Sequence, residues 1–295
     1  MHSALYGPAG FYRRELPGDH FRTAVTASAV FAQAIRVLAD RVDAALDFPD
    51  PFDVVDVGAG DGRLLTGLGV VPSRWRLTGV EVSGRFVAEI PAVTGLLVAN
   101  EWLDNVPLDV VAQGRAVEVD ETGVERLGAD VHPADLAWAA RWWPGVDRVE
   151  IGRTRDEAWA HAVSQVSRGL AVAIDYGHQC QDRRTTLTGY REGRQVVPVP
   201  DGSCDLTAHV ALDSCAAAAG SRLISQREAL LQLGISAERP DRCRAVTDAG
   251  GYLSALANSG HGAELLDPAG LGGFGWLVHA VGITDPLPPA MRKDR

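Results

Sequence analysis

A short apolar run that ends in three alternating glycines constrains the fold of this chain more than any other feature. The ten residues from Asp53 to Gly62 read DVVDVGAGDG, with β-branched residues first and glycines last. Such a run predicts a buried parallel strand that turns tightly into a helix. Alternating strands and helices predict an α/β fold with a mostly parallel sheet. Further strands are expected at residues 77–82, 96–100, 170–175 and 276–283.

The remaining segments are predicted to surround this sheet rather than to form a second domain of equal size. Apolar residues at helical spacing predict an N-terminal helix that ends near Asp47. Alternating apolar and polar residues around Gly114 and Gly123 predict a small antiparallel β insertion at about residues 108–130. We therefore expect an N-terminal lid and helical segment at 1–50, a main domain at 51–285 and a flexible tail at 286–295.

Helical spacing predicts three further helices, and one polar segment is expected to lack regular structure. The helices are expected at residues 134–142, 156–166 and 227–234. The polar stretch from 179 to 203 contains Gly and Pro and predicts a long loop, which in a compact domain is usually functional or disordered.

Composition excludes several classes of partner and site. The net charge of −10 disfavours nucleic acid as a ligand but permits a basic partner. The first residues do not resemble a signal peptide, and no apolar run is long enough to cross a membrane. The four cysteines are few and widely spaced, so neither a disulfide framework nor a metal site is expected. These features predict a cytoplasmic protein.

The glycine turn predicts a nucleoside site. Gly58, Gly60 and Gly62 follow the first buried strand, where glycines let the backbone approach a ligand closely. A dinucleotide fingerprint needs its third glycine at the position of Arg63, which disfavours a nicotinamide dehydrogenase. Glu81 ends the next predicted strand, where a carboxylate can accept hydrogen bonds from both ribose hydroxyls. The pattern favours S-adenosylmethionine; the alternative is a plain strand-to-helix turn beside a surface glutamate.

Several longer motifs extend this interpretation across most of the chain. They are GFY at 10–12, GDHFRT at 18–23, the glycine turn, VEVS at 80–83, NEWLDNVP at 100–107, DYGH at 175–178 and DGSCDLTAHV at 201–210. On these motifs the chain resembles the MidA family, bacterial and mitochondrial S-adenosylmethionine-dependent methyltransferases whose mitochondrial member assists complex I assembly as a protein arginine methyltransferase. The resemblance implies a Rossmann-like class I methyltransferase sheet.

One departure from the family pattern concerns the segment between Glu81 and Asn100. Only nineteen positions separate these residues, too few for the usual helix, third strand and helix. We expect that strand, and the acid that often contacts adenine after it, to be missing or vestigial.

The resemblance and the strand ends together assign a cofactor site. Asp56 and the backbone near Gly58 are expected to meet the amino acid end of the donor, and Glu81 its ribose. A loop that contains Asp19 is expected to cover the cofactor as a lid. The full set of predicted cofactor residues is Asp19, Phe21, Thr23, Asp56, Gly58, Ala59, Gly60, Glu81, Val82 and Asn100.

The acceptor side is predicted at the same edge of the sheet. A guanidinium is always charged and delocalised, so carboxylates must orient it and stabilise the charge that localises during attack. Glu101 and Asp104 follow the strand that ends at Asn100 and are the leading pair. The predicted catalytic residues are Glu101, Asp104, Asp175 and Tyr176, and the predicted substrate-binding residues are Asn105, His178, Asp205 and His209.

Structural roles are the alternative for these acceptor-side residues. Glu101 and Asp104 could be solvated loop carboxylates, with Asp104 capping a helix near Asn105. Asp175 could stabilise a turn, and Asp205 could be a helix N-cap.

The sequence therefore predicts methyl transfer from S-adenosylmethionine to a protein arginine. A small-molecule O- or N-methyltransferase is the second possibility. The third is an assembly factor that binds S-adenosylmethionine with little turnover.

Overall fold

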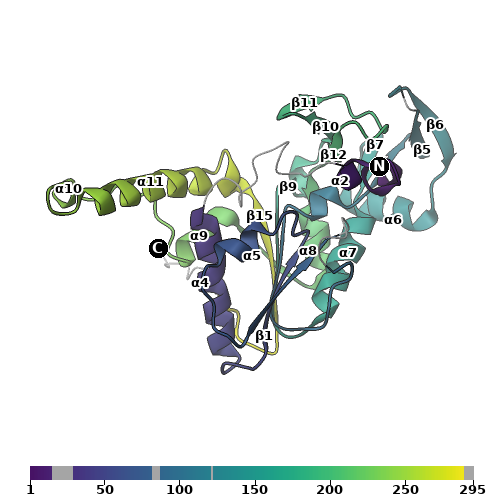
Figure 1. Cartoon of the computed structure of the whole chain (residues 1–295). Coiled ribbons are helices and arrows are strands. Elements are labelled where there is room, and N and C mark those ends of the chain that lie inside the picture. The colour runs from purple at the N-terminus through teal and green to yellow at the C-terminus, as the bar shows by residue number, and fades with distance from the viewer. Residues whose placement is uncertain (15–28, 82–86, 121, 289–295) are drawn as a thin grey trace, which may run out of the picture.

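A six-stranded sheet crosses the molecule in the order β14-β15-β8-β3-β1-β2 (Figure 1). The computed structural model describes residues 1–14, 29–81, 87–120 and 122–288. Strands β1, β2, β3 and β8 are parallel, whereas β15 is antiparallel to both of its neighbours. The predicted mostly parallel α/β sheet is thus confirmed. Its strands are β1 (Phe52–Val57), β2 (Trp75–Val80), β3 (Val93–Asn100), β8 (Val166–Asp175), β14 (Arg222–Ser225) and β15 (Gly275–Val281).

Helices cover both faces of this sheet because successive residues of each buried strand point to opposite sides. On one face, Val54 of β1 joins a core built with α4, α5, α9 and α11. On the other, Val55 joins a core built with α7 and α8. The helices are α4 (Ala29–Ala45), α5 (Arg63–Gly67), α7 (Arg153–Ser164), α8 (Leu212–Ala219), α9 (Gln226–Gln232) and α11 (Ala249–Leu266).

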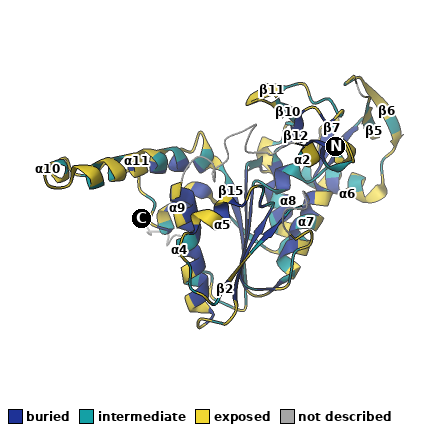
Figure 2. Ribbon diagram, viewed as in Figure 1, coloured by how far each residue is buried: buried dark blue, intermediate teal, exposed yellow. Residues whose placement is uncertain are grey.

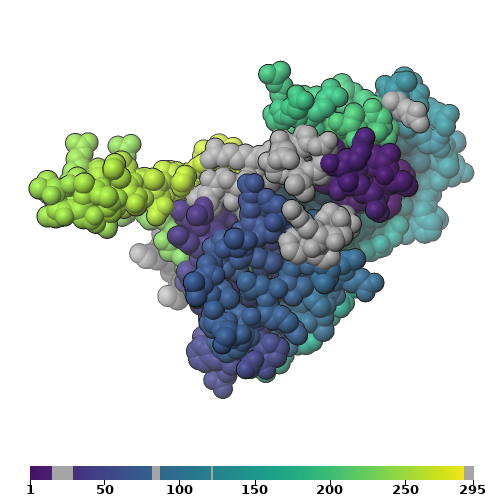
Figure 3. All heavy atoms as spheres, viewed as in Figure 1, coloured from purple at the N-terminus to yellow at the C-terminus, as the bar shows by residue number. Residues whose placement is uncertain are grey.

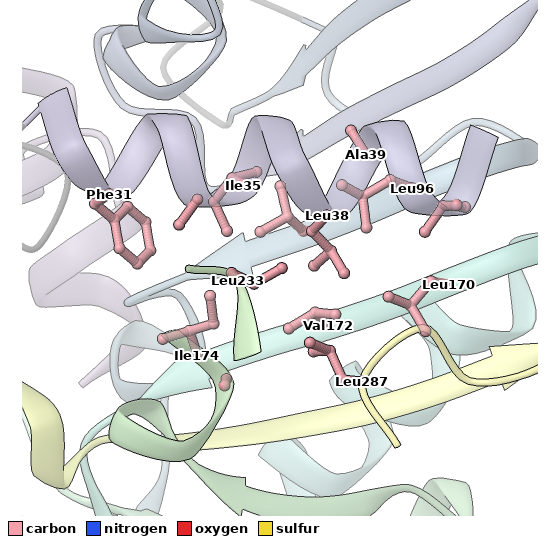
Figure 4. Packing of buried hydrophobic residues seen from close by; sticks show 14 of the residues in the cluster. Phe31, Ile35, Leu38, Ala39, Leu96, Leu170, Val172, Ile174, Leu233 and Leu287 are labelled. Atoms are coloured by element: carbon pink, nitrogen blue, oxygen red, sulfur yellow. The ribbon is translucent and has the colours of Figure 1, made fainter. Parts of the chain in front are cut away.

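Helix α4 is the N-terminal helix that the spacing of apolar residues predicts. Its residues Phe31, Ile35 and Leu38 recur at spacings of three and four and are fully buried. Figure 4 shows them directed toward Leu170 and Val172 of the central sheet. The helix is therefore part of the central core.

The expected third strand of the family pattern is missing from the described residues. Strand β2 lies at the edge of the described sheet, where an isolated parallel bridge joins Val80 to Val87. Within the described chain, a single bridge therefore occupies the place of a full strand.

The antiparallel insertion is present and is larger than predicted. Its turns contain Gly114 and Gly123, at φ 74° and 84°. Strand β7 adds a fourth strand, so the unit extends from the predicted limit near residue 130 to Ile151. It comprises β4 (Asp109–Ala112), β5 (Arg115–Val119), β6 (Glu125–Asp130), α6 (Pro133–Trp142) and β7 (Arg148–Ile151).

The long loop predicted at residues 179–203 is wrong in part, because it contains a β-hairpin. Strands β10 (Thr188–Arg191) and β11 (Arg194–Val196) pair with each other, and β10 also pairs with β12 (Asp205–Thr207). Because the segment is polar, its periodicity gives no sign of these strands. They are stabilised by backbone hydrogen bonds to their cross-strand partners. The short elements η3 (Cys180–Asp182), β9 (Gly177–His178) and β13 (Val210–Ala211) lie nearby in the chain.

Helices α1 (His2–Tyr6) and α2 (Phe11–Arg14) lie beside β12, against the surface formed by the insertion (Figure 3). Their buried residues Leu5 and Phe11 pack with Leu206 of β12. The N-terminus is therefore fixed to the end of the molecule at which β1 and β3 finish (Figure 1).

At the opposite side, α10 (Arg244–Thr247) and α11 extend away from the sheet and are largely exposed (Figure 2). The turns η2 (Leu103–Asn105) and η4 (Leu271–Gly273) complete the described elements. Within the described residues, no helix is both long and apolar enough to cross a membrane.

Candidate active site

The glycine turn after β1 is the tight strand-to-helix turn that its sequence predicts. Gly58, Gly60 and Gly62 adopt φ angles of 75°, 55° and 81°, a region that favours glycine. The Gly58 amide donates to Val80 O at 2.9 Å, which joins the turn to the end of β2. A Cβ atom on Gly60 would meet none of the described residues within 4 Å. Among these residues, the backbone at Gly60 therefore leaves room for a ligand.

Glu81 is directed at this turn. Its Oε2 accepts a hydrogen bond from the Gly60 amide at 3.0 Å. Asp56, at the end of β1, is buried, and burial followed by repulsion from Glu81 raises its pKa to about 8. Both acids therefore lie near the backbone that the sequence assigns to the donor.

Asn100 ends β3, the strand next to β1 in the sheet. Its Nδ2 donates to Glu101 Oε1 at 3.1 Å, while its buried Oδ1 accepts no hydrogen bond from the described residues. A buried acceptor without a donor costs free energy. An ammonium group at the amino acid end of a ligand would satisfy it.

The two predicted catalytic acids, Glu101 and Asp104, lie in different environments. Glu101 is partly exposed and adopts a left-handed φ of 51°, with its amide bonded to Ile174 O of β8 at 2.8 Å. Asp104 is buried in η2. Only Glu101 thus combines a place at the strand end with access from solvent.

The buried Asp104 carboxylate is the centre of a hydrogen-bond network. It accepts from the Tyr176 hydroxyl, from Thr207 Oγ1 at 2.8 Å and from Asn105 Nδ2 at 3.0 Å. Burial raises the pKa of Asp104, while the bonds from Tyr176 and Thr207 oppose that rise. The alternative of a solvated loop carboxylate or a helix cap is wrong for Asp104.

Asp175 ends β8 directly behind this network. Its Oδ2 accepts from the Asp104 amide at 3.2 Å, and its buried Oδ1 has no partner among the described residues. Burial, and then repulsion from Asp104 and Glu101, raise the pKa of Asp175 well above its usual range. Burial and the neighbouring acids therefore favour the protonated form of Asp175.

Two N-terminal tyrosines join the site, Tyr12 of the GFY motif and Tyr6, and neither is predicted from sequence as a site residue. The Tyr12 hydroxyl lies 2.6 Å from Asn105 Oδ1 and 2.8 Å from Asp205 Oδ1 and donates to these acceptors. Tyr6 donates to the Asn105 carbonyl at 3.0 Å. Asp205 lies in β12, so its alternative assignment as a helix N-cap is wrong. Burial raises the pKa of Asp205 to about 7.

The two predicted histidines lie beside Tyr176. The ring of His209 meets that of Tyr176 edge to face, 5.3 Å between centroids, and the ring of His178 lies 6.2 Å from that of His209. Burial and then Arg183 lower the pKa of His178 to about 4, and burial and then Arg184 lower that of His209. Both imidazoles are therefore neutral near pH 7.

Most of the predicted site residues thus lie at one edge of the central sheet. The exceptions fall outside the described residues, and their roles stay predictions: Asp19, Phe21, Thr23 and Val82. No cluster of three or more metal-ligating side chains is found in the described part of the chain.

Comparison with known proteins agrees with this geometry. The family model Methyltransf_28, described as "Putative S-adenosyl-L-methionine-dependent methyltransferase", matches residues 74–226. The chain belongs to this methyltransferase family. The match spans the edge formed by Glu81, Glu101 and Asp175, and the donor is S-adenosyl-L-methionine.

Two crystal structures from Burkholderia thailandensis are similar to this methyltransferase. One is a COG1565 superfamily member with bound S-adenosyl-homocysteine, 25% identical, with a TM-score of 0.76. The other is a native COG1565 superfamily protein, 28% identical, with a TM-score of 0.74. Each alignment covers 100% of this chain and 89% of the other. No curated protein matches the chain. The MidA-type resemblance and the class I fold are confirmed.

The residues of the methyltransferase fit its donor. Glu81 offers a carboxylate for a ribose, Gly60 leaves room beside the backbone, and Asn100 offers a buried acceptor for an ammonium group. The donor supplies an electrophilic methyl group, and the protein supplies its orientation and a site that excludes water.

Proposed function

We propose that this methyltransferase transfers a methyl group to a guanidinium nitrogen of a protein arginine. The observation that carries the proposal is the concentration of carboxyl groups at the donor edge of the sheet. Glu101 is partly exposed there, and the buried Asp104, Asp175 and Asp205 lie behind it. The accessible Glu101 carboxylate attracts a cation and repels an anion. The buried acids, whose pKa values are raised, contribute hydrogen-bonding groups behind it.

Glu101 is the residue that orients the acceptor in this proposal. A carboxylate can accept two parallel hydrogen bonds from a guanidinium, which fixes its plane as well as its position. The bond from the Glu101 amide to Ile174 O holds the backbone at the end of β3. The proton that the guanidinium loses passes to the Glu101 carboxylate, which can release it to water.

Asp104 and Tyr176 form the inner wall of the acceptor site. The Tyr176 hydroxyl and Thr207 Oγ1 both donate to Asp104, so the carboxylate is fixed and its charge is partly compensated. Fixed dipoles and charges stabilise a developing positive charge without reorganising during the reaction. The tyrosine ring supplies an apolar edge beside His209 that excludes water.

The test is incubation of the protein with S-adenosylmethionine labelled in its methyl group and a protein extract, followed by acid hydrolysis. We expect label in methylarginine, and a loss of at least about a hundredfold with E101Q, as for removal of one group that stabilises a transition state. E238Q changes an exposed glutamate outside the site and should behave as wild type.

Other labelling patterns contradict the proposal. Label confined to small molecules would favour the small-molecule O- or N-methyltransferase, and label in other amino acids would exclude arginine. Label in neither fraction would favour an assembly factor with little turnover. Binding of S-adenosyl-homocysteine, measured separately, distinguishes a wrong acceptor from a lost donor site.

A further inference from the structure

Arg155 is a buried cation that the sequence did not single out. It lies in the first turn of α7 and is 1% exposed. Within the described chain, no carboxylate is close enough to form an ion pair with it. A buried guanidinium without compensation is strongly unfavourable. Its neighbours must therefore supply acceptors for most of its donors.

Backbone carbonyls of two separate loops supply these acceptors. Nε donates to Val106 O at 3.0 Å, and Nη2 donates to Asp104 O. Nη1 donates to Ala208 O at 2.8 Å and to His209 O at 3.1 Å. One guanidinium thus connects segments that lie about a hundred residues apart in the chain.

Both segments carry acceptor-side residues. The first contains Asp104, and the second follows Thr207, whose hydroxyl donates to the Asp104 carboxylate at 2.8 Å. The Tyr176 hydroxyl donates to the same carboxylate and lies within hydrogen-bond distance of Thr207 Oγ1. A small displacement of either segment would therefore disturb the whole network.

We propose that Arg155 is a positioning residue for methyl transfer: it holds residues 103–106 and 207–209 together, so that Asp104, Thr207 and Tyr176 form one acceptor surface. The planar guanidinium offers five donors in a fixed arrangement, whereas a lysine ammonium offers three. Arg155 donates to four carbonyls, so lysine at this position loses at least one of these bonds and the planar geometry that joins the two loops. This inference depends on methyl transfer and not on arginine as the acceptor.

The positive charge of Arg155 also acts on the acceptor-side residues. It lowers the pKa values of Asp104 and Asp175, in opposition to their burial. The same positive charge contributes to the lowered pKa of His209, after burial and Arg184. Each of these groups belongs to the acceptor-side cluster.

The test compares R155K with R153K by hydrogen exchange in the presence of S-adenosyl-homocysteine. Arg153 lies on the same helix, but it pairs with Asp135 and Glu157 on the outer side. We expect R155K to raise the exchange rate at least about tenfold in both peptides, 103–109 and 206–210, because each segment loses hydrogen bonds to the guanidinium. The glycine turn at 58–62 should be unchanged.

Turnover gives a second readout. With labelled donor and extract, R155K should lower the rate by at least about tenfold at saturating donor, while KM for S-adenosylmethionine stays within about twofold. R153K should match wild type in both measurements.

Three results would overturn the inference: unchanged exchange in either segment of R155K, an equal rise of exchange throughout the central sheet, or a parallel loss of donor affinity. The last two would identify Arg155 as a residue required for folding alone. Because exchange and donor affinity are measured without an acceptor, failure of the arginine proposal would leave this test intact.

Discussion

Replacing Glu81 with glutamine removes a charge from the donor site while keeping the size of the side chain. In the free protein, Glu81 Oε2 accepts from the Gly60 amide at 3.0 Å, and the glutamine Oε1 can accept the same bond. The loss is therefore expected in the complex, where a carboxylate would accept from both ribose hydroxyls.

The size of the effect follows from those two bonds. A hydrogen bond to a charged group contributes about 1.5–3 kcal/mol, roughly twice a neutral one. Glutamine keeps one neutral bond, so the net loss is about 2–4.5 kcal/mol. This corresponds to a roughly 30- to 2,000-fold higher Kd for S-adenosyl-homocysteine.

Isothermal titration calorimetry of wild type and E81Q at pH 7.5 measures this change. Circular dichroism should show the same secondary structure in both proteins, and E238Q serves as the exposed control. An affinity of E81Q within about threefold of wild type would refute the assignment of Glu81 to the ribose, since about 0.7 kcal/mol is less than one charged bond.

Three further changes test the geometry of the fold and the donor site. G58A should lower the free energy of unfolding by about 1–3 kcal/mol, because Gly58 has φ 75° and a Cβ would lie 3.0 Å from Trp102 Cδ1; unchanged urea denaturation would contradict this contact. Burial and then Glu81 raise the pKa of Asp56 from 3.8 to about 8. Between those two pH values the folded state holds a proton that the unfolded state has lost. The free energy of unfolding therefore falls by about 1.4 kcal/mol for each unit that the pH rises. D56N should remove this contribution, and identical slopes for D56N and wild type at pH 5.5–7.5 would exclude it. L38A should cost about 2–5 kcal/mol through a cavity in the core of Figure 4; a change in the affinity for S-adenosyl-homocysteine would show that this core and the donor site are coupled.

The elements that the sequence predicts well are those whose pattern is local. A strand buried on both faces is rich in apolar residues, and all six residues of β1 are buried, the two aspartates included. Helix α4 is amphipathic with a 3.6-residue period, so Phe31, Ile35 and Leu38 were recognisable as one face. The positive φ angles of the glycine turn similarly follow from residue type.

The parts that the sequence did not predict depend on contacts between distant segments. A charged residue such as Arg155 is normally expected at the surface, and its burial depends on carbonyls that only the folded chain brings together. The bond from Tyr12 to Asp205 spans 193 residues. The hairpin of β10 and β11 is polar, so no apolar alternation indicates its pairing.

A crystal structure of the protein with S-adenosyl-homocysteine tests the central claim most directly, because it places the donor relative to both sets of residues. We expect the ribose hydroxyls on the Glu81 carboxylate, the amino group at Asn100 Oδ1 and the sulfur facing Glu101 and Tyr176. A nucleoside bound away from Glu81, or a sulfur directed away from the acid cluster, would contradict the account.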